Sequence, residues 1–344
     1  METLTKKLAA GNDLSDSEIQ DAVAQLVDEV ISAESKADFL VALAHKGETP
    51  GEIAAFAAAL REKSILPPIE RSWRESHEIL DVVGTGGDHL STFNISTTVA
   101  ILCAAAGVAV AKHGNRAVTS TVGSADVIET LGIRVDLTPE EAARSLREHN
   151  FAFFFAPSFH PAFKHIGPAR KICASRGRRT IFNILGPLLN PARPSAMLVG
   201  VPRPELCEPM ASALQTLGVR RGMVVCGQAD ERHLDELSTL GANHVAEFYQ
   251  ERGFNTSILT LENFPLHRAT LADLRGGDKH VNADIIRHIL HGKERGPKRD
   301  AVLLNAGAAL FVAGKAKSMV EGWELAGETI DGGRAGQKLA ELAK

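Results

Sequence analysis

The sequence predicts an α/β fold in which a small all-helical domain precedes a larger α/β domain, whose mostly parallel central sheet is flanked by helices. Two observations predict it. Residues 1–68 carry helix-capping patterns and apolar side chains at helical spacing. After Pro67-Pro68, short apolar runs alternate with amphipathic segments, as in parallel sheets covered by helices. We therefore expect a helical domain at residues 1–68 and an α/β domain at residues 69–344.

Two capping patterns mark helices in the first domain. Ser15-Asp16-Ser17-Glu18 has the spacing of a capping box. Thr49-Pro50-Gly51-Glu52 repeats it, with proline at the first helical position. The apolar residues that follow at helical intervals are Ile19, Val23, Leu26, Val30, Ile53, Phe56 and Leu60.

Short apolar runs in the second domain predict strands, and the segments between them predict helices. Thr138-Pro139-Glu140-Glu141 caps a helix that leads to Asn150, and Pro204 begins another that ends at Leu217-Gly218. A very apolar helix is expected over residues 301–313. The predicted strands are Ile79–Val83, Val108–Ala111, Ile133–Leu137, Phe151–Phe155, Ala196–Val201, Gly222–Cys226, His244–Gln250 and Thr256–Leu261, the last two separated by a turn at Arg252-Gly253.

Composition limits the functions to consider. The chain has 344 residues, of which 44% are hydrophobic and 23% charged, so it can fill a core. Its net charge of −4 provides no general attraction to nucleic acid or anionic membranes. The start, Met1–Lys7, is too polar for a secretory signal, and we expect a cytoplasmic protein with no membrane or nucleic-acid partner. The widely spaced cysteines predict packing rather than zinc or disulfides; they are Cys103, Cys173, Cys207 and Cys226.

Two glycine-bearing turns predict a phosphate site. Gly84-Thr85-Gly86-Gly87-Asp88 and Lys112-His113-Gly114-Asn115-Arg116 each follow a predicted strand. Glycine allows backbone N–H groups to approach an anion, and the helix opening at Thr92–Thr97 directs its free N–H groups to the first turn. The spacing fits neither a dinucleotide fingerprint nor a P-loop. One such turn is often mere packing, whereas two at neighbouring strand ends indicate a ligand with more than one phosphate.

Adjacent carboxylates suggest a metal site. Asp235-Glu236 lies between leucines in a loop after the strand Gly222–Cys226. Magnesium takes one or two carboxylates and completes its shell with water and phosphate oxygens. The alternative is a solvated surface pair, which is the commoner role of such dipeptides.

A third region combines aromatic and basic residues. Arg170 and His160 follow the run Phe153-Phe154-Phe155, and a guanidinium beside apolar surface can bind a small aromatic carboxylate. The alternative is a core strand followed by a basic surface helix. We favour the core for Phe153–Phe155, and for Arg170 both interpretations stay open.

Six motifs, in order and over nearly the whole chain, resemble the anthranilate phosphoribosyltransferases of tryptophan biosynthesis. The resemblance implies a Mg²⁺-dependent enzyme that transfers the 5-phosphoribosyl group of 5-phosphoribosyl 1-diphosphate to the amine of anthranilate. It also implies a homodimer formed through the helical domain, which receives a returning segment at about residues 161–177. The motifs are GTGGD at Gly84–Asp88, TFNIST at Thr92–Thr97, KHGNR at Lys112–Arg116, FFFAPSFHPAFKH at Phe153–His165, RTIFNILGPLLNP at Arg179–Pro191 and LDELS at Leu234–Ser238.

The resemblance assigns roles to individual residues. The residues with catalytic roles would be Lys112, His113, Asn115 and Arg170. Two Mg²⁺ ions per subunit would be held by Ser96, Asp235 and Glu236, and anthranilate would contact Gly84, His113, Asn115, His160 and Arg170. Phosphoribosyl diphosphate would be lined by Gly84, Gly87, Asp88, Thr92, Asn94, Ile95, Ser96, Thr97, Lys112, His113, Gly114, Asn115, Arg116, Ala117, Val118, Thr119, Ser120 and Ser124.

The chain departs from the usual family pattern in three places. The segment from Arg170 to Arg179 is about three residues longer, and Gly227–His233 similarly lengthens the approach to Asp235. Both are loop changes that bear on the placement of Arg170 and on the geometry of the metal loop. Thr121-Val122 stands where relatives commonly have a lysine and a serine.

The implied reaction sets the tasks of the site. Breaking the C1–O bond spreads positive charge over C1 and the ring oxygen of ribose while negative charge grows on the diphosphate, so stabilising charge and positioning dominate. An aromatic amine needs little activation, and His113 or His160 could take its proton. Two alternatives stay open: a pyrimidine nucleoside phosphorylase, in which Asp235-Glu236 would be idle, and a non-enzymatic relative that binds nucleic acid, which the net acidic charge disfavours.

Overall fold

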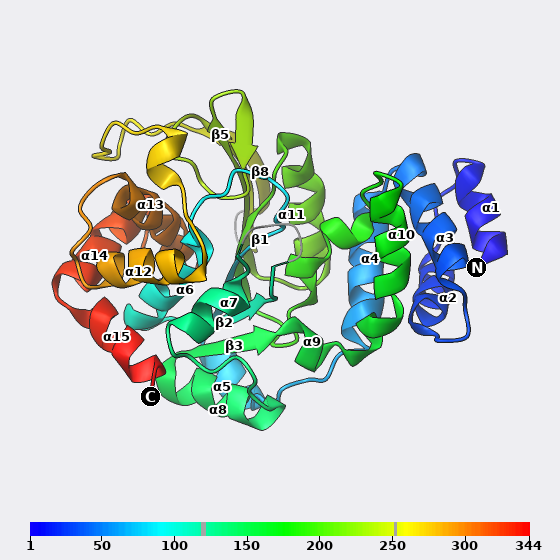
Figure 1. Ribbon diagram of the computed structural model, residues 1–344, viewed down its shortest axis with the longest axis horizontal. Coiled ribbons are helices and arrows are strands. Elements are labelled where there is room, and N and C mark those ends of the chain that lie inside the picture. The colour runs from blue at the N-terminus through cyan, green and yellow to red at the C-terminus, as the bar shows by residue number, and fades with distance from the viewer. Residues whose placement is uncertain (118–121, 251–252) are drawn as a thin grey trace.

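The computed structural model describes residues 1–117, 122–250 and 253–344. Its helical domain lies at one end of the molecule, beside a larger α/β domain that ends in the C-terminal helices (Figure 1). This arrangement confirms the predicted fold class. The helices of the helical domain are α1 (Glu2–Ala9), α2 (Asp16–Val27), α3 (Ala33–Lys46) and α4 (Pro50–Arg61), against which α10 (Gly167–Ser175) packs from later in the chain.

Both predicted capping boxes are confirmed. The Ser15 N–H donates to Glu18 Oε2 at 2.7 Å, and the Glu18 N–H donates back to Ser15 Oγ at 3.4 Å. The Thr49 pattern forms the same reciprocal pair at the start of α4. One detail is wrong: α2 ends at Val27, so Val30 lies beyond the helix and is 84% exposed instead of packing on its apolar face.

The central sheet is parallel in its middle and antiparallel at one side. The strand order is β3-β2-β1-β4-β5-β7-β8, with β6 paired to β5, and the pairs from β3 through β5 are parallel. The chain runs outward from β1 to β3 and then returns to the other side of β1, which places a topological switch point between β1 and β4. The strands are β1 (Ile79–Gly84), β2 (Ala109–Gly114), β3 (Phe151–Phe155), β4 (Ala196–Gly200), β5 (Arg221–Ala229), β6 (Arg232–Leu234), β7 (Asn243–Tyr249) and β8 (Gly253–Leu259).

One predicted strand is wrong. Residues 133–137 form an irregular connection between α7 (Ser124–Thr130) and α8 (Pro139–His149). Ile133 and Val135 are buried in the core while Arg134 and Asp136 point outward. The alternation that predicted a strand therefore reflects one-sided burial of an extended segment without a ladder partner.

Helices cover both faces of the sheet. On one face, α6 (Ile95–Ala105) and α13 (Pro297–Val312) form a large apolar cluster with β1, β2 and β4. On the other, side chains of β4 and β5 join α11 (Cys207–Thr216) and the helical domain in a second cluster, so the two domains share a core. The remaining helices are α5 (Arg71–Ser76), α9 (Ala156–Phe159), α12 (Lys279–Leu290), α14 (Met319–Asp331), α15 (Arg334–Leu342) and the short turns η1 (Pro161–His165), η2 (Ile181–Asn183), η3 (Gly186–Leu189), η4 (Pro204–Leu206) and η5 (Leu271–Leu274).

The predicted cysteine role agrees with the structure, because all four thiols are free and buried. Among the described residues, no helix is both long enough and apolar enough to span a bilayer.

Candidate active site

The first glycine turn, Gly84–Asp88, leaves the carboxyl end of β1. Gly86 and Gly87 have φ angles of 75° and 86°, a region that side chains disfavour, so glycine is required at both positions. The Gly86 N–H donates to Asp235 Oδ2 at 2.6 Å. The turn and the distant Asp235 therefore meet, as a joint phosphate and metal site requires.

Asp235 and Glu236 belong to the acidic loop, residues 234–238, which crosses the carboxyl ends of three neighbouring strands. A glycine lies beneath the loop at or near the carboxyl end of each strand. A Cβ at Gly84 would be 2.3 Å from Asp235 Oδ2, one at Gly200 would be 1.6 Å from the Asp235 carbonyl oxygen, and one at Gly227 would be 2.5 Å from the Glu236 carbonyl oxygen. The acidic loop can lie this close to the sheet only because these positions lack side chains.

The two carboxyl groups are poised to accept a cation. Burial raises the pKa of Asp235 well above its ordinary value, and nearby Asp88 and Glu236 raise it further. Burial also raises the pKa of Glu236, against the opposing charge of Lys112. A divalent ion would remove this mutual repulsion, and the oxygen-only donors suit Mg²⁺. Within the described part of the chain, no three His, Cys, Asp or Glu side chains are grouped as a metal cage.

The N-terminus of α6 completes this side of the site. The Ser96 N–H donates to Glu236 Oε1 at 3.1 Å, and Lys112 Nζ lies 3.4 Å from Ser96 Oγ. Before the helix, His89 and Ser91 both adopt positive φ angles of 55° and 56°, a conformation that non-glycine residues hold only under tertiary constraint. Asn94 is held by an Asn282 side-chain N–H at 2.9 Å. The segment from Asp88 to α6 is therefore held by a contact with a residue from a distant part of the chain.

Lys112 and His113 stand on β2 beside β1. The Lys112 ammonium is buried and donates to the Val82 carbonyl at 2.7 Å, while burial lowers its pKa and Asp81 and Glu236 oppose that change. Buried Asp81 accepts the His113 N–H at 3.4 Å and an Asn190 side-chain N–H at 2.8 Å. Burial raises the pKa of Asp81 to about 6. These contacts place a cation next to the acidic loop.

A row of rings connects His113 to Arg170. The ring centroids of His113 and His160 are 5.4 Å apart, His160 stacks on Phe163 at 4.9 Å, and Phe163 meets Phe182 at 6.2 Å. The Arg170 guanidinium carbon lies 5.7 Å from the Phe182 centroid. This row gives an aromatic ligand apolar surface between a cation and two imidazoles.

Few of the described side-chain polar atoms along this row make a hydrogen bond of good geometry. Among the described residues, His113 Nε2 and both ring nitrogens of His160 are buried and make no hydrogen bond of good geometry, although the main chain at Gly186 and Leu189 lies near the two rings. Burial lowers the pKa of His113 to about 3, with His160 adding to the effect, and lowers the pKa of His160 to about 4. Both imidazoles are therefore neutral near pH 7. Burial also lowers the pKa of Arg170, which has no carboxylate partner in the described structure.

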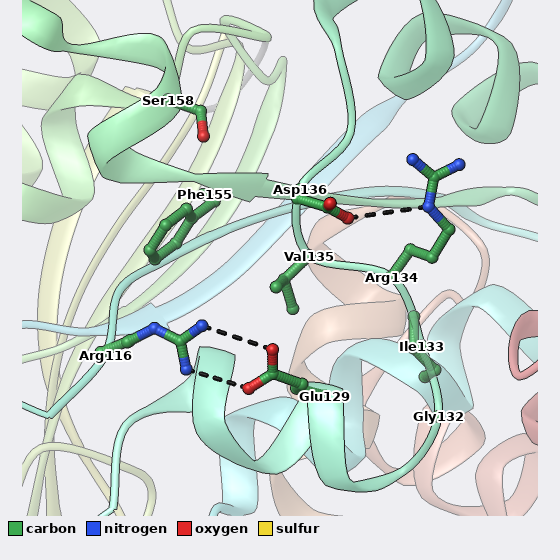
Figure 2. Close-up of a pocket in the computed structure, with 9 residues that line it drawn as sticks. All are labelled: Arg116, Glu129, Gly132, Ile133, Arg134, Val135, Asp136, Phe155 and Ser158. Atoms are coloured by element: carbon green, nitrogen blue, oxygen red, sulfur yellow. Dashed lines mark hydrogen bonds and ion pairs between the residues drawn. The ribbon is translucent and has the colours of Figure 1, made fainter.

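The Arg116 side chain forms ion pairs with carboxylates outside the acidic loop. Its guanidinium pairs with Asp126 at 3.1 Å and Glu129 at 3.0 Å and lies 5.6 Å from the Phe155 centroid. Arg116, Glu129 and Phe155 line a pocket of about 500 Å³ in which Arg134 likewise pairs with Asp136 (Figure 2). Because both arginines of this pocket are paired and it lacks the acidic loop, we do not assign the substrate site to it.

A smaller pocket of about 370 Å³ adjoins the first glycine turn. Its wall includes Gly87, Asp88 and Arg179, and Arg179 donates to the Gly87 carbonyl at 3.1 Å. This contact, at the end of one of the long segments noted in the sequence, braces the turn from the solvent side.

A carboxylate from α7, the helix after the second turn, binds main-chain N–H groups beside that turn. Asp126 accepts the N–H groups of Ala117 at 3.1 Å and Gly123 at 3.0 Å. Partial burial opposes its ionisation, but these donors and Arg116 hold its pKa below the ordinary value. The Ser124 hydroxyl donates to the Asn115 carbonyl at 3.4 Å. The main chain around residue 117 is therefore held by an internal anion.

The structure brings together most of the site residues that the sequence predicts. Ile95 is a core residue, so it can reach a ligand only through its main chain. The guanidinium of Arg116 is turned to its acidic partners, and Arg170 is linked to the rest through the ring row. The predicted residues Val118, Thr119 and Ser120, and the Thr121 substitution, lie outside the described residues. The residues gathered at the carboxyl ends of β1 and β2 are Gly84, Gly87, Asp88, Asn94, Ser96, Lys112, His113, Gly114, Asn115, His160, Asp235 and Glu236.

Sequence reasoning missed several supporting residues. Asp81 lies in an otherwise apolar strand, and Asn190 follows an apolar turn. A single polar residue among apolar neighbours was the sequence pattern that could have identified each of them. Phe163 and Phe182 lie within two of the family motifs, but only the tertiary fold places them beside the histidines.

Comparisons with known proteins find similar sequences over nearly the whole chain. Residues 76–336 match the "Glycosyl transferase family, a/b domain", and residues 2–64 match the "Glycosyl transferase family, helical bundle domain". Anthranilate phosphoribosyltransferase of Petrotoga mobilis is 44% identical over 339 residues, covering 98% of this chain and 95% of that protein.

Solved structures show the same fold. The anthranilate phosphoribosyltransferase of Thermus thermophilus is 43% identical with a TM-score of 0.89, covering 99% of this chain and 98% of its own. The Saccharomyces cerevisiae enzyme in complex with PRPP and Mg is 28% identical with a TM-score of 0.86, covering 99% and 96%.

Proposed function

The chain belongs to the anthranilate phosphoribosyltransferase family, and from this premise we propose that its own residues transfer the 5-phosphoribosyl group of phosphoribosyl diphosphate to the amine of anthranilate, releasing diphosphate. The observation that carries the proposal is the 2.6 Å bond between the Gly86 N–H and Asp235 Oδ2, which joins the phosphate turn to the metal carboxylates. The relatives favour this function over a nucleoside phosphorylase or a nucleic-acid-binding protein.

The leaving group is handled at the switch point of the sheet. Asp235, Glu236 and Ser96 would hold Mg²⁺, for which we propose two ions per subunit. When bound, Mg²⁺ supplies positive charge to the diphosphate as its negative charge grows. Lys112 adds a fixed cation, and the glycine turn offers main-chain donors. The Asp88–Thr97 segment and the residues from Lys112 to Ser124 named above line the rest of the donor substrate.

The acceptor is held by the ring row. The unpaired Arg170 guanidinium binds the anthranilate carboxylate, and Phe163 and Phe182 pack against its ring. The amine then faces the ribose C1 near Gly84 and Asn115. The buried imidazoles of His113 and His160 are neutral and can accept the proton that the amine releases.

The quaternary and cellular settings are part of the proposal. We assign residues 1–68, with the returning segment 161–177, to the helical domain, and propose that this domain forms a homodimer. Val30, an exposed apolar side chain there, is one that such a contact would cover. Four free buried cysteines suit a reducing compartment, and we propose the cytoplasm. Sedimentation equilibrium tests the dimer.

Activity is tested by mixing the protein with anthranilate, phosphoribosyl diphosphate and Mg²⁺ and following the loss of anthranilate fluorescence. D235N/E236Q should lose Mg²⁺-dependent turnover. The matched control is D230N/E231Q, an exposed acidic pair in the β5–β6 turn, which should retain it. Unchanged fluorescence with folded wild-type protein would contradict the acceptor, and full Mg²⁺-dependent activity in D235N/E236Q would contradict the metal assignment.

A further inference from the structure

The acidic loop is held in place by two buried asparagine side chains. The Leu237 N–H donates to Asn305 Oδ1 at 2.9 Å, and Asn305 Nδ2 donates to the Leu237 carbonyl at 2.9 Å. The next residue repeats the pattern, since the Ser238 N–H donates to Asn243 Oδ1 at 2.7 Å and Asn243 Nδ2 donates to the Ser238 carbonyl at 3.1 Å. Each amide thus satisfies both main-chain groups of one residue.

A side-chain amide is suited to this role at any pH. It presents a donor and an acceptor side by side, as a peptide unit of a neighbouring strand does. An ionised aspartate in the same place can only accept, and a leucine can do neither. Asn305 and Asn243 therefore act as substitute strand neighbours for a loop segment that has no ladder partner of its own.

Both asparagines belong to a helix or a strand, and their side-chain amides form hydrogen bonds as donors and as acceptors. Each is 0% exposed. Asn305 lies in the apolar helix α13 and its second amide hydrogen bonds the Ala301 carbonyl at 2.9 Å, while Asn243 is the first residue of β7. A buried amide is costly unless its hydrogen bonds are made, so these side chains stay in this orientation.

The arrangement has a consequence for Glu236, the residue directly before Leu237. Asp235 and Glu236 are adjacent, half-buried carboxyl groups in a segment that no ladder partner holds, so the geometry of the loop depends on its hydrogen bonds. The bonds to Leu237 and Ser238 hold the loop from one side. The donors at Gly86 and Ser96 hold it from the other.

We propose that Asn305 and Asn243 are positioning residues that keep the acidic loop in its cation-binding geometry before any cation arrives. The proposal rests on the proposed function of Asp235 and Glu236 as Mg²⁺ ligands. It predicts that the loop is already ordered in metal-free protein and that losing either amide raises the Mg²⁺ concentration the enzyme needs.

Two measurements on the full chain test it. In metal-free protein, hydrogen exchange at the Leu237 amide should be at least about tenfold faster in Asn305→Leu than in wild type, because the acceptor is gone. The Mg²⁺ concentration for half-maximal rate should rise about tenfold, with kcat at saturating Mg²⁺ within about threefold of wild type, because the ligands remain but are displaced. Asn305→Asp keeps the acceptor and should protect the Leu237 amide better than Asn305→Leu.

The matched control is Thr329→Val. Thr329 is equally buried, in α14, and its hydroxyl bonds the Leu325 carbonyl at 2.7 Å without contacting the acidic loop. It should lower thermal stability yet leave both readouts unchanged. The proposal is overturned if Asn305→Leu behaves like Thr329→Val.

The variant Asn243→Leu, which removes both the donor and the acceptor, is read at the Ser238 amide and by the Mg²⁺ requirement, and it decides the matter if Asn305→Leu does not fold. An unchanged Mg²⁺ requirement in that variant overturns the proposal. Absence of any Mg²⁺ requirement in wild type would instead contradict the proposed function, and the exchange measurement would still decide whether the asparagines hold the loop.

Discussion

Gly200, the last residue of β4, lies directly beneath the main-chain carbonyl of Asp235. A Cβ at Gly200 would be 1.6 Å from that oxygen, well inside van der Waals contact. Gly200 pairs with Gly84 of β1 in the sheet, and a Cβ on Gly84 would also strike Asp235. Two paired glycines thus form the surface on which the acidic loop lies.

Gly200→Ala should displace the acidic loop. The new methyl group cannot share space with main-chain atoms, so we expect a stability loss of about 1–3 kcal/mol from overpacking. Activity should fall about 100-fold, because a shift of about 1 Å misplaces the metal ligands. Thermal denaturation and kcat with saturating substrates measure these effects. Gly51→Ala is the control, since its Cβ would lie 3.9 Å from Thr49 Oγ1 on a helix, and near-normal behaviour of both variants would contradict this account.

Arg170→Gln should weaken recognition of the acceptor carboxylate. A hydrogen bond between charged groups contributes about 1.5–3 kcal/mol, which corresponds to a loss of about 10- to 100-fold in kcat/KM for anthranilate. The KM for phosphoribosyl diphosphate should change little. With aniline, which has the amine but no carboxylate, wild type and variant should react equally. A deficit that persists with aniline would mean that Arg170 acts in some other way.

Lys112→Met should lower kcat about 100- to 1,000-fold, because a buried cation beside the leaving group is removed. The Mg²⁺ requirement should not rise, since the lost charge opposed cation binding at Glu236. Lys36→Met is the control. Lys36 is also buried and donates to two carbonyls, of Asp28 at 2.6 Å and His165 at 3.0 Å, so it should cost stability without the loss of kcat. Equal kcat losses in the two variants would refute a specific role.

The buried histidines should make the fold acid-sensitive. The pKa of His113 is lowered to about 3 from an ordinary value of 6.5. Between these two pH values the imidazole is protonated in the unfolded chain but not in the folded protein. With respect to this group, the free energy of unfolding is highest above pH 6.5. It decreases as pH falls toward 3, by an amount on the order of a few kcal/mol. Urea denaturation between about pH 4.5 and 7.5 should show a flatter pH dependence for His113→Gln than for wild type. Parallel curves for the two proteins would contradict the burial of a neutral imidazole.

The local patterns of the sequence were sufficient for most elements. The capping boxes at Ser15 and Thr49 depend on side chains three residues apart, and they form as predicted because the interaction is local. The strand predicted over residues 133–137 was wrong, because that prediction also used only a local pattern. Alternating burial is the same for an extended connection as for a strand, and only pairing with a neighbour distinguishes them.

The sequence by itself determined which chemistry is available: glycine turns after strands, an acidic pair in a loop, and a family pattern that spans both domains. Tertiary structure decided which groups meet. Sequence could not show that Arg116 turns to Glu129, that Phe163 and Phe182 connect His160 to Arg170, or that Asn305 bonds Leu237. The reason is physical: these contacts join segments far apart in the chain, and their geometry is set by how helices and strands pack rather than by local preference.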